Sequence, residues 1–138
     1  MKRHTKIELP ADRQNLNKFI DFIIDFAKSG GFHDEGIWEL ELAADEIFTN
    51  IINYAYPQQK GNIEVNCRFG NQKILIEIYD HGIPFNPLSY PNPEIIPDIQ
   101  EIRTDGYGIF LARRLMDNIV YRRDGNRNCL SLEKNVGT

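Results

Sequence analysis

The stretch LAADEIFTNIINYAYP, residues 42–57, has the residue spacing of an amphipathic helix that carries an unusual polar stripe. At about 100° per residue, Glu46, Asn50 and Asn53 fall within roughly 60° of one another, and Glu39 joins the stripe a turn or two earlier. A different sector collects the apolar side chains that would face a core, namely Leu40, Ala44, Ile47, Phe48 and Ile51. The stretch therefore predicts a helix that covers a core with one side and presents polar groups on another.

The polar stripe allows two interpretations. A solvated side is the simpler one, and this helix alone favours it. Asn is a poor helix former, however, so two asparagines about one turn apart suit a merely wet face less well than Lys, Glu or Gln would. A carboxylate one turn from an amide oxygen can instead combine a general base with a ligand for a hard cation such as Mg²⁺, which prefers oxygen ligands.

The bulk composition is that of one ordinary globular domain spanning residues 1–138. A net charge of −4 provides no positive field toward nucleic acid or a membrane, and the Arg113-Arg114 and Arg122-Arg123 doublets are interpreted as solvated positions. Neither a signal peptide nor a stretch of transmembrane length is found, so a cytoplasmic location is expected. Cys67 and Cys129 form no CxxC pattern and lie in strand-like sequence, which predicts buried free thiols.

The order of the expected elements predicts an α+β sandwich. A short edge strand over 3–9 is followed by a helix over 12–29 that Asp12 caps and a second helix over 34–56 that Asp34 caps. Two alternating runs, 62–69 and 73–80, are separated by Gly70-Asn71, a weaker variant of the Asn-Gly hairpin signal. A third helix over 106–118 precedes a final pair of strands, 119–124 and 129–135, around Gly125-Asn126. This order favours helices on one face of a mostly antiparallel sheet.

A second candidate position lies where the most apolar strand ends, in ILIEIYDHGIPF, residues 74–85. Asp80 ends the run, and Gly82 and Pro84 turn the chain at once. A carboxylate at the exit of a strand often serves only the turn, because it accepts nearby backbone N–H bonds. It is equally able to accept a bond from an exocyclic amine such as that of adenine, with Gly82 letting the ring approach.

The third candidate region is the segment from His81 to Asp105 together with the helix entry after it. The segment holds five of the seven prolines, and a structureless stretch of about 25 residues in a small domain suggests a lid or a binding loop. Gly106 and Gly108 then open a helix whose free N–H groups and positive dipole end suit phosphate. A GxxxxGKS/T motif is missing, and Leu111 replaces the third glycine of GxGxxG, so neither a P-loop enzyme nor a dinucleotide dehydrogenase fits.

In this order, the three regions resemble the GHKL (Bergerat-fold) ATPases, and among them the bacterial anti-sigma-factor serine/threonine kinases. ADEIFTNIINYAY is similar to the N box of that branch, YDHGIPFNP to its G1 box, and GYGIFLARRLMDNIVYRRDGNRNCLSLEK to its G2 box and closing strands. The resemblance runs over nearly the whole chain. It implies a histidine-kinase-like ATPase fold that binds ATP and Mg²⁺.

The resemblance also implies a role for each matching residue. Glu46 would be the catalytic base that takes the proton from a protein serine or threonine. Asn50 would hold Mg²⁺ between the triphosphate oxygens, and Asn53 would lie near the phosphates. Asp80 would bind the adenine amine, with Gly82 making room for the base.

The remaining matches concern the lid and the phosphates. Residues 85–105 would form the ATP lid, and Pro84 belongs to the nucleotide-binding G1 motif. Arg103, at the end of the lid, would reach the γ-phosphate, while Gly106 and Gly108 would contact phosphate through their backbones.

Two departures from the family pattern bear on this interpretation. Many relatives have two glycines where this chain has Asp105-Gly106, and a carboxylate there would repel phosphate unless it turns outward. Some relatives carry a threonine pair on the late strand, where this chain has Asn128-Cys129. Asn128 is a candidate donor in place of the missing hydroxyl.

The function implied is that of an anti-sigma factor and kinase that phosphorylates a STAS-type anti-anti-sigma protein, binds a sigma factor and forms a homodimer. A nucleotide-dependent module that sequesters a partner with little turnover is the main alternative, which the two departures leave open. A stand-alone ATP hydrolase is another. A histidine kinase fragment is disfavoured, because the sequence shows no phosphoacceptor helix ahead of the domain.

Overall fold

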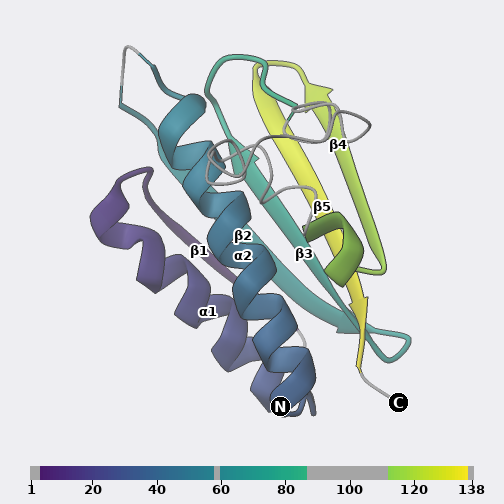
Figure 1. Ribbon diagram of the computed structural model, residues 1–138. Coiled ribbons are helices and arrows are strands. Elements are labelled where there is room, and N and C mark those ends of the chain that lie inside the picture. Colours follow the sequence, from purple (N-terminus) through teal and green to yellow (C-terminus); the bar gives the residue numbers. More distant parts are fainter. Residues whose placement is uncertain (1–3, 58–59, 87–111, 137–138) are drawn as a thin grey trace, which may run out of the picture.

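The computed structural model describes residues 4–57, 60–86 and 112–136, which form a sheet with helices packed on one face (Figure 1). Its strands are β1 (His4–Pro10), β2 (Asn62–Gly70), β3 (Lys73–Asp80), β4 (Asn118–Asp124) and β5 (Arg127–Asn135). A 3-10 turn, η1 (Arg13–Asn15), leads into α1 (Leu16–Ser29), and α2 (Asp34–Tyr54) follows. The predicted α+β class, with helices on one face, is confirmed.

The strand order is β1-β2-β3-β5-β4, and each neighbouring pair is antiparallel. The first strand is an edge strand, as its sequence predicts. Because β5 is inserted between β3 and β4, Asp80 lies opposite Asn128, and Asn128 lies opposite Arg123. This register gathers polar residues from three strands at one end of the sheet.

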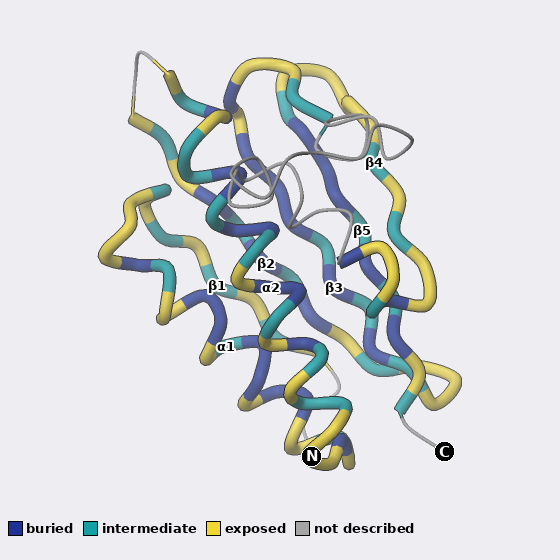
Figure 2. Tube along the Cα trace, viewed as in Figure 1, coloured by how far each residue is buried: buried dark blue, intermediate teal, exposed yellow. Residues whose placement is uncertain are grey.

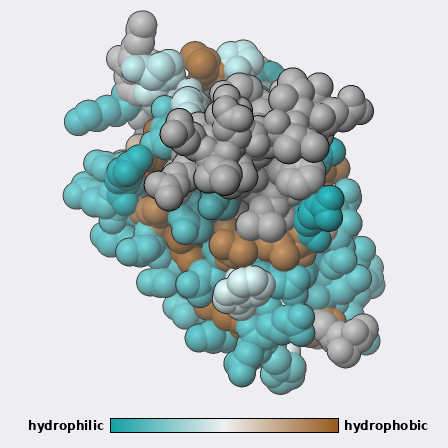
Figure 3. Space-filling model, in the orientation of Figure 1, coloured by the Kyte–Doolittle hydropathy of each residue, from teal (hydrophilic) through white to brown (hydrophobic). Residues whose placement is uncertain are grey.

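The core lies between the sheet and the two helices. Alternation along the strands directs Ile76 of β3 and Leu132 of β5, which lie opposite each other, into it. On the helix side, Phe19 of α1 stacks on Phe48 of α2 with ring centroids 5.0 Å apart. The buried positions follow the sides of the helices and strands that face each other (Figure 2). Hydrophilic side chains predominate on the coloured part of the face shown in Figure 3, with hydrophobic atoms showing between them. Amphipathic helices of this kind are stabilised mainly by burying their apolar stripe.

The boundaries of α2 differ from the prediction. The N-cap is His33, which makes no side-chain capping bond, and Asp34 lies in the first turn, where a carboxylate interacts favourably with the positive end of the helix dipole. The helix ends at Tyr54 rather than at Tyr56. Beyond it, the Tyr56 hydroxyl donates to the carbonyl of Asn62, 2.7 Å away, so this side chain ties the helix exit to β2.

Two turn predictions had different outcomes. Gly125-Asn126 does join β4 to β5. The β2–β3 turn, however, is Asn71-Gln72, with φ of 54° and 62°, and Gly70 pairs with Lys73 inside the ladder. A two-residue hairpin turn of this twist needs positive φ at both central positions, and Asn tolerates that conformation better than most residues.

The third predicted helix is described only from residue 112, and it ends at 115 instead of 118. The backbone N–H of Asp117 donates to the Glu133 carbonyl (2.9 Å), and the Asp117 carboxylate accepts from the Asn135 N–H (2.6 Å). These two bonds attach the chain to β5 before β4 begins, which is why the helix stops early. Residues 106–111 lie outside the described ranges.

Cys67 and Cys129 are both buried free thiols, as predicted. Burial raises the pKa of Cys67 to about 12, which leaves this thiol uncharged and unreactive at neutral pH. No helix in the described ranges combines the length and the apolar character needed to cross a bilayer.

Candidate functional site

The polar stripe of α2 is not simply a wet face. Asn50 is only 1% exposed, and Glu46 and Asn53 are half-buried. The Asn50 side-chain N–H donates to the backbone carbonyl of Glu46 (2.8 Å). This bond fixes the orientation of the amide, so its oxygen is the atom directed away from the helix backbone. An amide buried at this position is more costly than an aliphatic side chain unless its polar atoms are used.

Glu39, the first member of the predicted stripe, has another role. Its carboxylate lies 3.6 Å from the ammonium of Lys134 on β5. The same ammonium donates to the carbonyl of Leu115 (2.9 Å), and Lys134 is 8% exposed. Glu39 therefore neutralises a buried cation that joins α2, β5 and the helical turn at 112–115.

Asp80 occupies the exit of β3 and is 3% exposed. One carboxylate oxygen, Oδ1, accepts from the backbone N–H of Gly82 (2.9 Å) and from the side-chain N–H of Asn128 (2.8 Å). Among the described residues, no donor is bonded to the other oxygen, Oδ2. Burial raises the pKa of Asp80 above its usual value, while the bonds from Asn128 and Gly82 and the charge of Arg123 oppose that rise. The result is a carboxylate whose orientation is fixed through Oδ1.

Asn128 is the residue that joins this end of the sheet together. Besides its bond to Asp80, its Nδ2 donates to the carbonyl of Ile83 (2.8 Å). Its Oδ1 accepts from the Arg123 guanidinium (3.2 Å), the Phe85 N–H (3.3 Å) and the Tyr121 hydroxyl. At 4% exposure, this amide is almost fully bonded. Asn128 therefore uses its side-chain N–H groups within the protein, one of them on the Asp80 carboxylate.

Arg123 and Tyr121 also belong to the hydrogen-bonded cluster around Asn128, and the sequence alone does not identify them. Arg123 is exposed, as the sequence predicts, yet its guanidinium also donates to the Gly82 carbonyl (2.9 Å). Arg122, its neighbour in the doublet, points to the other face of the sheet because side chains alternate along a strand. Arg123 and Tyr121 are two residues apart on β4 and therefore lie on the same face of the strand. This spacing is informative only once the β4–β5 register is known.

Gly82 is required by packing on the end of α2. A Cβ at this position would lie 2.1 Å from the carbonyl oxygen of Ala55, and the neighbouring N–H of Ile83 donates to that same oxygen (2.9 Å). The ring of Phe85 also lies against Tyr54, with centroids 5.6 Å apart. The exit of β3 and the end of α2 are therefore joined directly.

We expect Gly82→Ala to lower the free energy of unfolding by about 1–3 kcal/mol, because the added methyl meets backbone, which no rotamer change can relieve. Urea denaturation measures the effect. Gly70→Ala is the matched control, since a Cβ at Gly70 has no atom within 4 Å. Equal stability of the two variants would contradict the close approach at Ala55.

Three of the predicted site residues, Arg103, Gly106 and Gly108, lie outside the described ranges, as does most of the predicted lid. Pro84 is described and is exposed. The described residues contain no group of three or more His, Cys, Asp or Glu side chains able to hold a metal. An oxygen ligand such as the Asn50 amide suits a cation that takes most of its ligands from water and phosphate.

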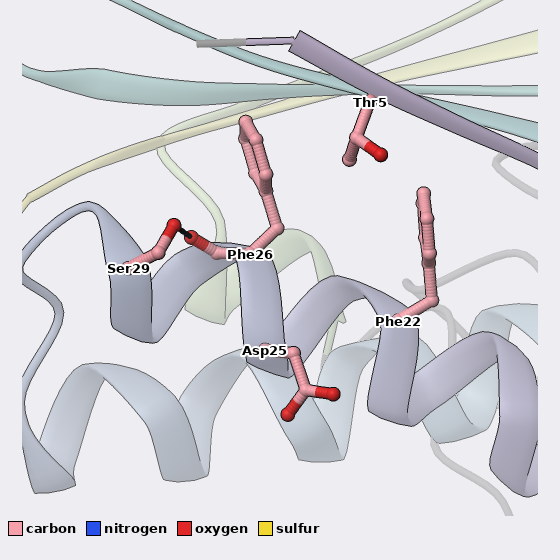
Figure 4. A pocket seen from close by; sticks show the side chains of 5 residues that line it. All are labelled: Thr5, Phe22, Asp25, Phe26 and Ser29. Carbon is pink, nitrogen blue, oxygen red and sulfur yellow. Dashed lines mark hydrogen bonds between the residues drawn. The ribbon is translucent and has the colours of Figure 1, made fainter. Parts of the chain in front are cut away.

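A separate cavity lies behind α1, between that helix and β1 (Figure 4). Phe22 and Phe26 point from the helix toward the strand that carries Thr5, whereas Asp25 points away. The Ser29 hydroxyl donates to the Phe26 carbonyl (2.6 Å). None of the predicted site residues that the structure describes lines this cavity, so it is not the candidate site.

Comparison with known proteins agrees with this arrangement. Residues 9–134 match the family model described as a histidine kinase-like ATPase domain. The chain is 30% identical over 124 residues to "Serine-protein kinase RsbW" of Listeria innocua serovar 6a, covering 84% of this chain and 78% of the relative. It is 28% identical over 130 residues to the protein of the same name from Bacillus cereus (strain AH187), covering 90% and 81%.

Proposed function

Because the chain belongs to the histidine kinase-like ATPase family, we propose that it transfers the γ-phosphoryl group of Mg·ATP to a serine or threonine of a STAS-type anti-anti-sigma protein. The observation that carries the proposal is the Asp80 carboxylate, which is held on one oxygen and has no bonded donor among the described residues on the other. It lies beside the end of the helix that bears Glu46 and Asn50. Relatives named serine-protein kinase over most of the chain support the same activity.

Adenine recognition rests on Asp80. Because Gly82 and Asn128 occupy Oδ1, Oδ2 would accept from the exocyclic amine of the base. Asn128 in turn is held by Arg123 and Tyr121 of β4, so the carboxylate is fixed before ligand binds. Such preorganisation lowers the entropy lost on binding. Gly82 and Pro84 would shape the edge of the site.

Phosphoryl transfer would occur along the polar stripe of α2. The acceptor hydroxyl oxygen forms a bond to the γ-phosphorus as the bond between that phosphorus and the bridging oxygen of ADP breaks, and the hydroxyl proton passes to the Glu46 carboxylate. Magnesium, when bound, neutralises charge on the triphosphate. The Asn50 oxygen would be its protein ligand, and Asn53 would lie near the phosphates. Catalysis of this kind rests mainly on positioning and electrostatics.

Residues that lie mostly outside the described ranges would complete the site. We propose that residues 85–105 close over the nucleotide as a lid. Arg103 would reach the γ-phosphate, and Gly106 and Gly108 would donate backbone N–H bonds to phosphate. We further propose that the protein acts in the cytoplasm as a homodimer and binds a sigma factor when it is not engaged by its phosphorylatable partner.

The rival function is a nucleotide-dependent module with little turnover. One of its two supports was the replacement of threonine by Asn128, and this residue does bond to Asp80. This bond supports a role for Asn128 in holding the proposed adenine-binding carboxylate. The other support, Asp105, lies outside the described residues.

Incubation with γ-labelled ATP and Mg²⁺, with and without a purified STAS-domain protein from the same organism, tests the proposal. We expect label on a serine or threonine of the STAS protein. Nucleotide-dependent complex formation without label would favour the binding module, and phosphate released without any partner would favour an ATP hydrolase.

A further inference from the structure

A small hollow lies on the side of α2 that faces the start of α1. Its volume is about 220 Å³, and its lining residues are Arg13, Leu16, Thr49, Ile52 and Asn53. The helices α1 and α2 lie side by side and run in opposite directions (Figure 1), which places η1 beside the C-terminal half of α2. The hollow shares Asn53 with the polar stripe, so it adjoins the proposed phosphoryl-transfer site.

The position of Arg13 at the rim is set by its local structure. Asp12 caps η1 by accepting from the N–H of Gln14 (3.4 Å). Asn15, which is 6% exposed, anchors the turn by donating to the Pro10 carbonyl (2.9 Å). The Arg13 guanidinium then donates to the Asn53 side-chain oxygen across the hollow, at 3.4 Å. Arg13 is thus held at the mouth by a turn of defined geometry.

The hollow combines the Arg13 cation with two apolar side chains. Leu16 of α1 and Ile52 of α2 are half-buried hydrophobic residues that line it. Within the described ranges, the four ion pairs found involve other residues, and no carboxylate lies within 4.0 Å of the Arg13 guanidinium. An exposed arginine alone is ordinary. A cation at the mouth of an apolar hollow is complementary to an apolar side chain that has a carboxylate next to it.

The hollow is close to the proposed catalytic base. Thr49, on its wall, follows Glu46 by three residues, which corresponds to a rise of about 4.5 Å along the helix. A protein segment anchored in the hollow would therefore have neighbouring residues at the level of Glu46. A free nucleotide needs no apolar contact at this place, whereas a protein substrate needs an anchor outside the nucleotide pocket.

We propose that this hollow is a docking point for the phosphate-accepting protein, which inserts an apolar side chain against Leu16 and Ile52 and pairs a carboxylate with Arg13. The inference rests on the proposed kinase function and adds to it the chemistry of the partner's contact. The partner surface that it specifies is acidic and apolar.

Direct binding tests the inference independently of turnover. The probe is the purified STAS-domain protein, titrated calorimetrically into the protein saturated with Mg²⁺ and a non-hydrolysable ATP analogue. We expect Arg13→Glu to weaken this binding by about tenfold or more, with the affinity for the analogue unchanged. Arg13→Lys retains the charge and should lose less. Thr49→Phe, which fills the hollow without altering charge, should also weaken binding.

The matched control is Lys6→Glu, a charge reversal at an exposed residue of β1 that is in no ion pair among the described residues and lies outside the hollow. It should leave partner binding unchanged. The docking inference is overturned if Arg13→Glu binds the partner as wild type does, if the wild type does not bind it, or if Arg13→Glu weakens the ATP analogue equally, which would place Arg13 at the nucleotide. A wild type that binds the partner but transfers no label contradicts the kinase function and leaves the docking inference standing.

Discussion

Glu46→Gln is expected to lower kcat for phosphoryl transfer by about 10²- to 10⁴-fold, the range typical for loss of a general base. Gln keeps the shape of Glu but cannot take the proton of the acceptor hydroxyl. The Asn50 side chain donates to the backbone carbonyl of Glu46, which the substitution does not alter, so that amide should stay in place. The affinity for an ATP analogue should therefore be unchanged. Single-turnover transfer of label and equilibrium binding measure the two quantities separately.

Glu41→Gln is the matched control for this variant. Glu41 lies on the same helix, is exposed, and belongs to neither the polar stripe nor the hollow. It should transfer phosphate at the wild-type rate. Transfer by Glu46→Gln at a rate equal to that of Glu41→Gln would show that another group accepts the proton, or that none is needed.

Asp80→Asn is expected to reverse the preference between ATP and inosine triphosphate, whose base carries a carbonyl in place of the amine. In the wild type, the open carboxylate oxygen accepts from the amine and repels a carbonyl, so ATP should bind about 10- to 100-fold more tightly. In the variant, the amide oxygen would keep the bonds from Gly82 and Asn128. Its N–H₂ would then face the base, where it opposes an amine and donates to a carbonyl.

Asn128→Ala refines the same measurement. Without Asn128, one donor to Oδ1 is lost, together with the links to Arg123 and Tyr121. We expect the preference for ATP to shrink without reversing, because the carboxylate remains but is less firmly placed. Calorimetric titration of each variant with both nucleotides gives the ratios. An unchanged ratio in Asp80→Asn would show that Asp80 does not contact the base.

The parts of this fold that the sequence predicts well are those governed by local periodicity. The apolar alternation of β3 and the helical spacing around Glu46 identified both elements, and with them Asp80 and Asn50. The turn between β2 and β3 lies one residue later than the Gly70-Asn71 signal predicts. An Asn-Gln turn carries a weaker sequence signal than a turn that contains glycine. Likewise, the end of the helical turn at 115 depends on bonds from Asp117 to β5, which are distant in sequence.

The parts of the site that could not be predicted depend on contacts between distant segments. Asn128 meets Asp80 only because β5 is inserted between β3 and β4, and Arg123 follows from the same topology. The steric need for Gly82 comes from the Ala55 carbonyl at the end of α2. The sequence does not predict a role for Arg13, because none of its neighbours along the chain indicates that its side chain contacts Asn53.

The most direct test of the central claim is a crystal structure of the protein with Mg²⁺ and a non-hydrolysable ATP analogue. The account predicts the adenine amine within hydrogen-bonding distance of Asp80 Oδ2 and Mg²⁺ coordinated by the side-chain oxygen of Asn50, with Glu46 beside the γ-phosphate. Adenine bound away from Asp80, or a metal that takes no ligand from α2, would contradict it.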